Sequence, residues 1–171
     1  MQELTSLIRD IPDFPKPGII FRDITPLLKQ PSTFQKAIDL MANPFKDEHI
    51  DYVLAIEARG YLLGTPIALA LGAGFVPARK VGKLPYRTYR STYELEYGSA
   101  EIEIHQDAFT KDQRILLVDD VLATGGTLEA AIDLVQQSGS TVAGISVLIE
   151  LTALRGRSRL GNVPLSTLIQ Y

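Results

Sequence analysis

The chain has 171 residues, of which 46% are hydrophobic and 22% charged, so its length and composition fit one globular domain and exclude a disordered chain. It contains no cysteine, which excludes disulfides and thiolate chemistry, and its net charge of −3 argues against a broad nucleic-acid-binding surface. No apolar run is long enough to span a membrane, and no signal peptide is recognisable at the N-terminus. We therefore expect a cytoplasmic protein with neither a membrane nor a nucleic acid as its partner.

The first forty residues are expected to contain two helices separated by an irregular segment. Apolar residues spaced three and four apart predict a short helix over residues 4–11 and a second helix over residues 31–42. The prolines and the glycine of residues 12–18 exclude a helix between them.

The rest of the chain alternates between expected strands and helices. Short apolar runs typical of buried strands occupy residues 52–56, 75–79, 115–118, 142–149 and 165–170. A helix expected over residues 60–71 joins the first two runs, and this βαβ order predicts parallel pairing. Strict alternation over residues 101–104 predicts a half-exposed antiparallel strand. The expected fold class is α/β, with helices on both faces of the sheet and ligands bound beyond the carboxyl ends of its strands.

Residues 115–127 are the most informative stretch, because a strand, two acids, a glycine turn and a helix follow one another. Asp119 and Asp120 are expected just past the end of the strand, within reach of solvent and ligand. The residues Thr124-Gly125-Gly126-Thr127 open a helix over 127–137, and a glycine turn at a helix N-terminus is an anion site. Carboxylates repel a phosphate but accept hydrogen bonds from sugar hydroxyls, so a phosphorylated ribose is the simplest ligand for both halves.

Other interpretations of this stretch are less consistent with the sequence. The metal-holding strand of a nucleotide hydrolase would require a phosphate loop of the G-x-x-x-x-G-K-[ST] type, which is absent from the sequence. The first strand of a signalling receiver domain would lie near the start of that domain, whereas more than a hundred residues precede this strand. A strand, turn and helix with acids of no function is a further alternative.

Two basic loops are also candidate site segments. Residues 57–60 follow a strand and open a helix, so Arg59 can bind an anion there, although Glu57 and Arg59 could instead form a surface pair. Residues 81–98 show no apolar periodicity and carry Lys83, which is typical of a long mobile lid over a charged reaction centre. The alternative for this second loop is a disordered surface segment.

Residues 14–26 are the candidate base-binding segment. The ring of Phe21 can stack on a purine, and the backbone groups of Ile20 and Arg22 can read its edge. Val121 can close the opposite face of the base. Alternatively, Phe21 belongs to the hydrophobic core.

The run 118–127 resembles the signature with which type I phosphoribosyltransferases bind 5-phosphoribosyl 1-diphosphate (PRPP). Residues 14–26, 57–61, 79–85 and 95–98 resemble motifs of the adenine-specific branch of that family, and the likeness covers nearly the whole chain. It implies a central, mostly parallel, twisted sheet flanked by helices, a small N-terminal hood at residues 1–30 that binds the base, and a flexible catalytic lid at residues 81–98. It also implies a single domain over residues 1–171, a homodimer in which Arg79 or Arg87 can cross the interface, and a non-proline cis peptide in the loop that holds pyrophosphate.

The resemblance implies transfer of 5-phosphoribose from PRPP to adenine, which gives AMP and pyrophosphate, with Mg²⁺ held mainly by PRPP and water rather than by the protein. The implied catalytic residues are Arg59, Glu96 and Tyr97, with Glu96 as the acid/base group near N7 of the purine. The implied adenine-binding residues are Ile20, Phe21, Arg22 and Val121. The implied PRPP- and AMP-binding residues are Arg59, Lys80, Lys83, Asp119, Asp120, Ala123, Thr124, Gly125, Gly126 and Thr127.

Two alternatives to the adenine reaction are considered. A transferase that prefers xanthine or hypoxanthine would be expected to lack the Lys-Leu-Pro and Glu-Tyr-Gly sequences at residues 83–85 and 96–98. A non-catalytic regulator of transcription that senses PRPP would be expected to carry a basic recognition helix, and the residues before the first core strand contain none.

Overall fold

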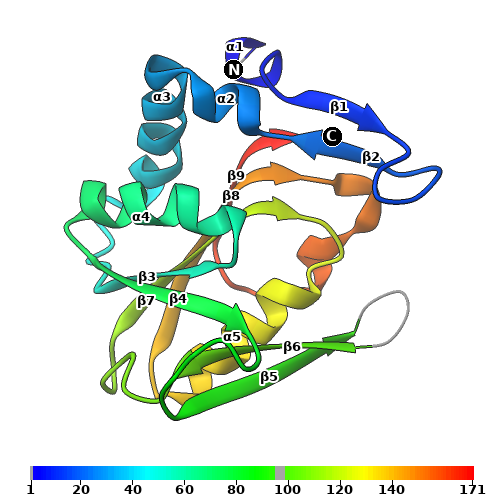
Figure 1. Cartoon of the computed structure of the whole chain (residues 1–171). Helices are drawn as coiled ribbons and strands as arrows, with labels where there is room; N and C mark the ends of the chain where they lie inside the picture. Colours follow the sequence, from blue (N-terminus) through cyan, green and yellow to red (C-terminus); the bar gives the residue numbers. More distant parts are fainter. Residues whose placement is uncertain (1, 95–98) are drawn as a thin grey trace.

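The computed structural model describes residues 2–94 and 99–171, which form a seven-stranded sheet, a separate two-stranded hairpin and helices on both faces of the sheet (Figure 1). Neighbouring strands run parallel from β4 through β3, β7 and β8 to β9, while β6 pairs antiparallel with both β4 and β5. This arrangement confirms the expected α/β class. In spatial order the strands are β5 (Thr88–Glu94), β6 (Ser99–His105), β4 (Gly74–Lys80), β3 (Tyr52–Ile56), β7 (Arg114–Leu122), β8 (Thr141–Glu150) and β9 (Leu165–Gln170).

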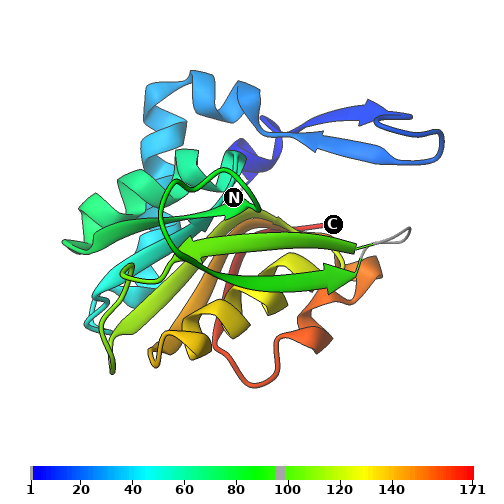
Figure 2. The same ribbon diagram turned by 60° about the horizontal axis from the view of Figure 1, so that its bottom comes forward.

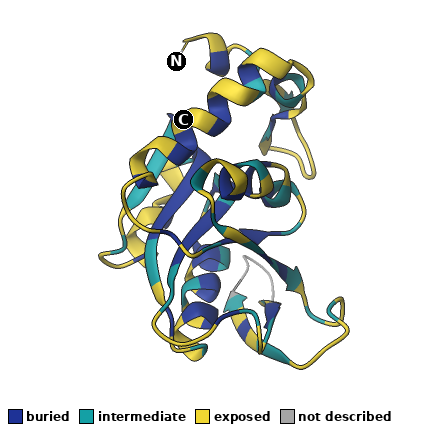
Figure 3. Cartoon of the chain, turned by 90° about the vertical axis from the view of Figure 1, so that its left-hand side faces the viewer, coloured by how far each residue is buried: buried dark blue, intermediate teal, exposed yellow. Residues whose placement is uncertain are grey.

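Each face of the sheet has its own layer of helices and its own hydrophobic cluster. On β3, Val53 and Ala55 belong to the cluster under α3 and α4, whereas Leu54 and Ile56 belong to the cluster under α5. Because both faces are covered, the strand does not alternate between apolar and polar residues. Figure 3 shows the central strands mostly in the dark blue of buried residues. The helices are α1 (Gln2–Thr5), α2 (Thr25–Lys29), α3 (Pro31–Ala42), α4 (Arg59–Leu71) and α5 (Gly126–Gln137), and the 3₁₀ segments are η1 (Asn43–Phe45), η2 (Thr152–Leu154) and η3 (Gly156–Arg159). In the described part of the chain, no helix combines the length and the apolar character needed to cross a membrane.

The N-terminal hairpin is formed by β1 (Arg9–Pro12) and β2 (Ile20–Asp23), which pair antiparallel and extend away from the main sheet (Figure 2). The loop between them contains a cis peptide before Pro15 and a left-handed Gly18 with φ of 85°. Residues 2–30 therefore place an exposed ribbon next to the body of the domain.

The helix expected over residues 4–11 is wrong beyond Thr5, where α1 ends. The spacing that predicted it has another cause, because Leu4 and Ile8 are both buried although the chain is extended from Arg9 onward. Oppositely charged residues directly across the hairpin favour the strand. These cross-strand ion pairs are Arg9–Asp23 and Asp10–Arg22.

Asp119 and Asp120 lie within β7 rather than past its end, which corrects the expectation that the strand stops at Val118. Pairing with β3 does end there, opposite Ala55, but pairing with β8 continues to Leu122. Over its last residues, β7 therefore has a neighbour on one edge only. The edge that β3 leaves free faces a cleft.

The expectation of an irregular loop across residues 81–98 is wrong for Thr88–Glu94, which form β5. Tyr89 and Tyr93 pack toward the α5 side, whereas Arg90 and Thr92 are exposed. This alternation is a period-two pattern that is visible in the sequence. The remaining expected helices and strands are confirmed, with boundaries that differ by no more than two residues. The expectation that the strand at residues 101–104 is half-exposed is wrong for Glu103, which is 1% exposed because backbone N–H groups of residues 82–84 and the Thr88 hydroxyl bind its carboxylate.

Candidate active site

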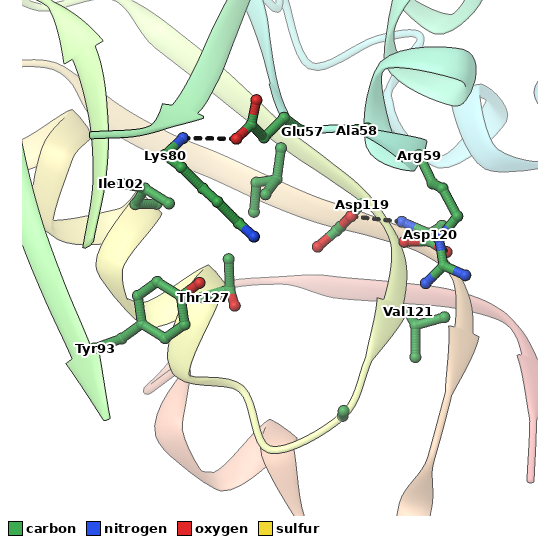
Figure 4. A pocket seen from close by; sticks show the side chains of 12 residues that line it. Glu57, Ala58, Arg59, Lys80, Tyr93, Ile102, Asp119, Asp120, Val121 and Thr127 are labelled. Carbon is green, nitrogen blue, oxygen red and sulfur yellow. Dashed lines mark hydrogen bonds and ion pairs between the residues drawn. The ribbon is translucent and has the colours of Figure 1, made fainter. Parts of the chain in front are cut away.

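A cleft of about 300 Å³ opens at the carboxyl ends of β3, β4 and β7. Its position follows from the sheet, because the loops that leave these three strands meet at one edge. Figure 4 shows the side chain of Lys80 pointing into this cleft and that of Arg59 turned toward Asp120. The lining residues are Ile56, Glu57, Ala58, Arg59, Lys80, Tyr93, Ile102, Asp119, Asp120, Val121, Ala123 and Thr127.

The two adjacent carboxylates occupy different surroundings. Asp120 is 5% exposed and its Oδ2 lies 2.7 Å from Nε of Arg59, whereas Asp119 is half-buried and its Oδ1 accepts the N–H of Asp120 at 2.8 Å. Burial, and then the charge of Asp120, raise the pKa of the Asp119 carboxyl well above its ordinary value. Burial also raises the pKa of Asp120, although the Arg59 guanidinium opposes this shift. The expectation that solvent reaches both acids is therefore wrong for Asp120.

The turn that follows the acids is shaped by close packing of two glycines. Gly125 precedes α5 with φ of 86°, and a Cβ built on it would lie 2.4 Å from the carbonyl oxygen of Gly156. A Cβ on Gly156 would lie 2.2 Å from the carbonyl oxygen of Ala123. The N-terminus of α5 therefore faces a small hollow of about 60 Å³ that is lined by the turn itself, including Thr124 and Thr127. Backbone N–H groups at such a helix start have no intrahelical partner and bind anions.

The loop after β3 brings a second helix N-terminus to the cleft. The peptide between Glu57 and Ala58 is cis, as the resemblance implied. At the start of α4, a Cβ on Gly60 would lie 3.0 Å from Oδ1 of Asp119, so the helix approaches β7 closely only because this residue is glycine. The start of α4 thus lies directly beside the acid pair.

Glu57 holds the neighbouring basic segment rather than Arg59, so the surface pair considered from the sequence is not formed. Its carboxylate accepts the N–H of Lys80 at 2.9 Å and lies 3.1 Å from Nζ of Lys83 and 3.2 Å from Nε of Arg79. Burial acts to raise the pKa of Glu57, but these bonds outweigh it and hold the pKa below its ordinary value. Lys80 and Lys83 are consequently both placed beside the cleft.

Three of the four candidate base-binding residues lie on the hairpin, which meets the cleft where Phe21 approaches Arg59. The Arg59 guanidinium lies 4.7 Å from the ring centre of Phe21, on β2. Phe21 is half-buried and belongs to neither core cluster, which argues against the interpretation of this ring as core. Ile20 is 50% exposed on the same strand, and Val121 lines the cleft from β7. Arg22 turns away from the cleft, stacks on the ring of Tyr171 at 3.8 Å and pairs with Asp10.

The structure thus brings together the candidate residues of three separate sequence motifs, from β3, β4 and the β7–α5 segment. The sequence interpretation missed Tyr93 and Ile102, which line the cleft, and Gly156, which supports the turn. The alternation around Tyr93 and Ile102 could have identified the first two, whereas nothing local to Gly156 reveals its packing. Glu96 and Tyr97 lie outside the described residues.

Chemically, the cleft has one wall of positive groups and helix N-termini and another of carboxylates. The first wall suits phosphate oxygens. The second suits hydroxyl donors, which stabilise carboxylates whose pKa is raised by burial. A sugar that carries phosphate groups meets both requirements.

Comparison with known proteins gives one family. A family model described as the phosphoribosyl transferase domain matches residues 23–165. The chain is 53% identical over 169 residues to the adenine phosphoribosyltransferase of Myxococcus xanthus, and the match covers 99% of this chain and 92% of that protein.

Solved structures are similar over the same length. A crystal structure of adenine phosphoribosyltransferase from Rhodothermus marinus has a TM-score of 0.96 and 50% identity, covering 99% of this chain and 97% of that one. The Saccharomyces cerevisiae adenine phosphoribosyltransferase, in complex with an imino-altritol bisphosphate and adenine, has a TM-score of 0.93 and 43% identity, covering 98% of this chain and 97% of that one.

Proposed function

The chain belongs to the phosphoribosyl transferase family, and from that premise we propose that it transfers 5-phosphoribose from PRPP to adenine, giving AMP and pyrophosphate. The observation that carries the proposal is the cleft in which the Asp119–Asp120 pair adjoins a glycine turn at the start of α5. This juxtaposition matches a phosphorylated ribose, which needs hydroxyl acceptors and phosphate donors side by side.

The choice of adenine rests on relatives that match nearly the whole chain. Proteins more than 50% identical over about 99% of this chain carry the adenine transferase name, and the yeast structure is a complex with a bisphosphate and adenine. The xanthine- or hypoxanthine-preferring transferase and the PRPP-sensing regulator are not favoured by these relatives.

The proposed roles divide the cleft between the parts of PRPP. Asp119 and Asp120 accept hydrogen bonds from the ribose hydroxyls, and the backbone and hydroxyls of residues 123–127 bind the 5-phosphate. Arg59, Lys80 and Lys83 stabilise the pyrophosphate as it leaves with increasing negative charge. The Arg59–Asp120 ion pair of 2.7 Å supports this division, because it holds the guanidinium next to the carboxylate pair.

The reaction breaks the bond between the anomeric carbon and the pyrophosphate oxygen and forms a bond from that carbon to adenine. The sugar becomes cationic in the transition state, so the nearby carboxylates favour it. Adenine loses a proton as it becomes a nucleoside, and by family resemblance Glu96 exchanges that proton near N7, with Tyr97 beside it. We propose that both residues act from the catalytic lid of the family, which excludes water from the cleft.

Mg²⁺ is the metal implied by the family. Within residues 2–94 and 99–171, no group of three or more His, Cys, Asp or Glu is arranged to hold a metal ion. The Asp119–Asp120 pair fits a nearby cation, because burial makes its negative charge costly. Mg²⁺ held mainly by PRPP and water would supply charge stabilisation for the leaving pyrophosphate, with Asp119 and Asp120 as the nearest protein carboxylates in our proposal.

The base-binding part of the proposal uses the hairpin and β7. Phe21 stacks on adenine, Val121 covers its other face, and backbone groups of Ile20 and Arg22 read its edge. The contact between Phe21 and Arg59 supports this placement, since it brings the ring to the border of the cleft.

A homodimer and a cytoplasmic location complete the proposal. Leu62 and Leu69, seven residues apart on α4, are 49% and 78% exposed, so one face of this helix offers an apolar surface to a second copy. Arg87 can then reach toward the partner's cleft, whereas Arg79 is bound within its own chain by Glu57 and the carbonyl oxygen of Lys83. Sedimentation of the active protein is expected to show a dimer, and an active monomer would contradict the proposed homodimer.

The test of the reaction is an incubation of the protein with PRPP, Mg²⁺ and one purine base at a time, followed by chromatography of the products. AMP from adenine, with little product from hypoxanthine, guanine or xanthine, is expected. Product from hypoxanthine or xanthine alone would support the same-family alternative. Calorimetric binding of PRPP without any nucleotide would support the regulator.

A further inference from the structure

Glu103, on β6, is the most buried carboxylate among the described residues, with 1% exposure. It lies outside the cleft lining, opposite Arg79 in the β4–β6 pair. Removing a carboxylate from water is costly unless strong hydrogen bonds replace the lost hydration. The partners of Glu103 therefore show what this charge stabilises.

One oxygen of Glu103 binds three consecutive backbone groups. Its Oε1 accepts the N–H of Gly82 at 2.9 Å, of Lys83 at 3.2 Å and of Leu84 at 3.2 Å. The chain can curl around a single oxygen in this way because Gly82 has φ of 86°, a conformation that other residues adopt at a cost.

The second oxygen ties the same carboxylate to β5. Oε2 accepts the hydroxyl of Thr88 at 3.0 Å and lies 3.4 Å from Nε of Arg90. Burial acts to raise the pKa of Glu103, but the bonds from Leu84, Thr88, Gly82 and Lys83 outweigh it and lower the pKa, so this group stays charged at neutral pH.

The segment that Glu103 curls contains Lys83 and begins two residues after Lys80, which lines the cleft. Glu57 binds it from the other side, through the N–H of Lys80 and the ammonium of Lys83. The carbonyl oxygen of Lys83 also accepts a hydrogen bond from Arg79 at 3.2 Å. Residues 80–84 are thus clamped between two carboxylates, of which Glu57 borders the cleft and Glu103 does not.

We propose that Glu103 is a positioning residue for PRPP, because the hydrogen bonds it accepts from residues 82–84 hold Lys80 and Lys83 at the pyrophosphate side of the cleft. Glu103 itself touches no substrate. This inference rests on the proposed function for its substrate, although the clamp itself can be measured without any reaction. It also divides the 81–98 segment into a fixed root at residues 82–84 and a part beyond it.

The test compares Glu103→Ala with Glu101→Ala, a change two residues away on the same strand. Glu101 is exposed and accepts the Thr92 hydroxyl at 3.1 Å, so it is a matched control. Amide exchange without ligand is expected to accelerate at residues 82–84 in the Glu103 variant and to stay unchanged in the control. The KM for PRPP is expected to rise about tenfold, which is the size of effect expected when hydrogen bonds to a charged group are lost. The KM for adenine is expected to change less than about twofold.

Glu103→Gln serves as the conservative variant, because its carbonyl oxygen can still accept the three N–H groups. It is expected to restore most of the affinity for PRPP. If the alanine variant does not fold, Glu103→Asp replaces it, since its carboxylate is one methylene too short to reach all three groups. An equal rise in both KM values, or unchanged exchange at residues 82–84, would overturn the positioning role.

Failure of the proposed function would look different. A wild-type protein that forms no AMP would refute the reaction, while the exchange measurement would still test the clamp. Calorimetry with Mg²⁺ and inorganic pyrophosphate then replaces the kinetic comparison, and an equal affinity in wild type and Glu103→Ala would refute the link from clamp to anion.

Discussion

The β1–β2 hairpin and the β7–α5 segment both border the candidate cleft, but different interactions hold them in place. β7 is buried in the sheet between β3 and β8, and the turn after it packs backbone to backbone against Gly156. The hairpin is a separate two-stranded ribbon whose ties to the domain include the stack of Arg22 on Tyr171 and the approach of Phe21 to Arg59.

The difference indicates how the two substrates are handled. An isolated two-stranded ribbon is marginally stable, so the position of the hairpin depends on a small number of side-chain contacts. The phosphoribosyl side depends instead on strand pairing and on glycines that allow no side chain, which fixes it together with the core. Changes at the β7–α5 segment should therefore impair PRPP use strongly, whereas changes at the hairpin should impair adenine use mildly.

The largest effect is expected from Asp119→Asn. Misplacing the ribose hydroxyls should lower kcat by about a hundredfold or more. Because burial and Asp120 make the charge of Asp119 costly, the neutral variant should keep or slightly raise the melting temperature. Steady-state kinetics and thermal melts, with exposed Asp39→Asn as the control, measure both. Parallel loss of stability and activity would indicate a structural acid.

Gly125→Ala should have the next largest effect. Its Cβ would meet the carbonyl of Gly156 at 2.4 Å, so the turn must shift, and we expect PRPP and AMP affinity to fall about tenfold or more while adenine affinity is kept. Gly72→Ala is a matched control, since Gly72 has φ of 65° but a Cβ there would meet no atom within 4 Å. Calorimetry with AMP and with adenine separates the two outcomes. Equal loss in both glycine variants would mean that backbone strain alone, and not contact with Gly156, matters.

Lowering the pH should weaken PRPP binding before it unfolds the protein. The raised pKa of Asp119 means that it takes up a proton, and weakens PRPP binding, at a higher pH than an ordinary carboxyl. Glu57 and Glu103 have lowered pKa values, so their stabilisation is complete above the unfolded pKa of about 4 and is lost only as the pH falls through the folded values. PRPP titrations and melts from neutral pH to about pH 4 should show affinity falling first, with Asp119→Asn lacking this early step. Simultaneous loss of binding and folding in the wild type would contradict the assignment.

The sequence allowed good prediction where local chemistry determines the structure. The apolar run before Asp119 and the paired glycines after it define β7 and α5 without distant information. The end of β7 was misplaced because it depends on β8, which extends pairing to Leu122 after β3 has diverged.

Prediction failed where distant residues decide the conformation. Residues 9–12 form a strand that pairs with β2, where Arg9 and Asp10 face opposite charges, although Leu4 and Ile8 keep a helical spacing. The contact of Gly156 with Gly125 joins positions 31 residues apart, and no local pattern marks it. The strand at residues 9–12 and the contact that supports the glycine turn therefore became visible only in the structure.

The smallest effect is expected at the hairpin, from Tyr171→Leu. The ring of Tyr171 carries the Arg22 guanidinium at 3.8 Å, and Arg22 also pairs with Asp10 on β1, so this stack links both strands of the hairpin to the residue that follows β9. The main-chain carbonyl of Tyr171 accepts hydrogen bonds from Thr152, which should keep the backbone in place when the ring is lost. A cation–π contact at a partly exposed site contributes about 0.5–1 kcal/mol, which corresponds to a rise of about threefold in the KM for adenine with the KM for PRPP unchanged. Tyr171→Phe keeps an aromatic face under Arg22 and should retain the wild-type KM for adenine. If the leucine variant raises the KM for PRPP instead, or if the phenylalanine variant behaves like leucine, the hairpin is not positioned by this stack.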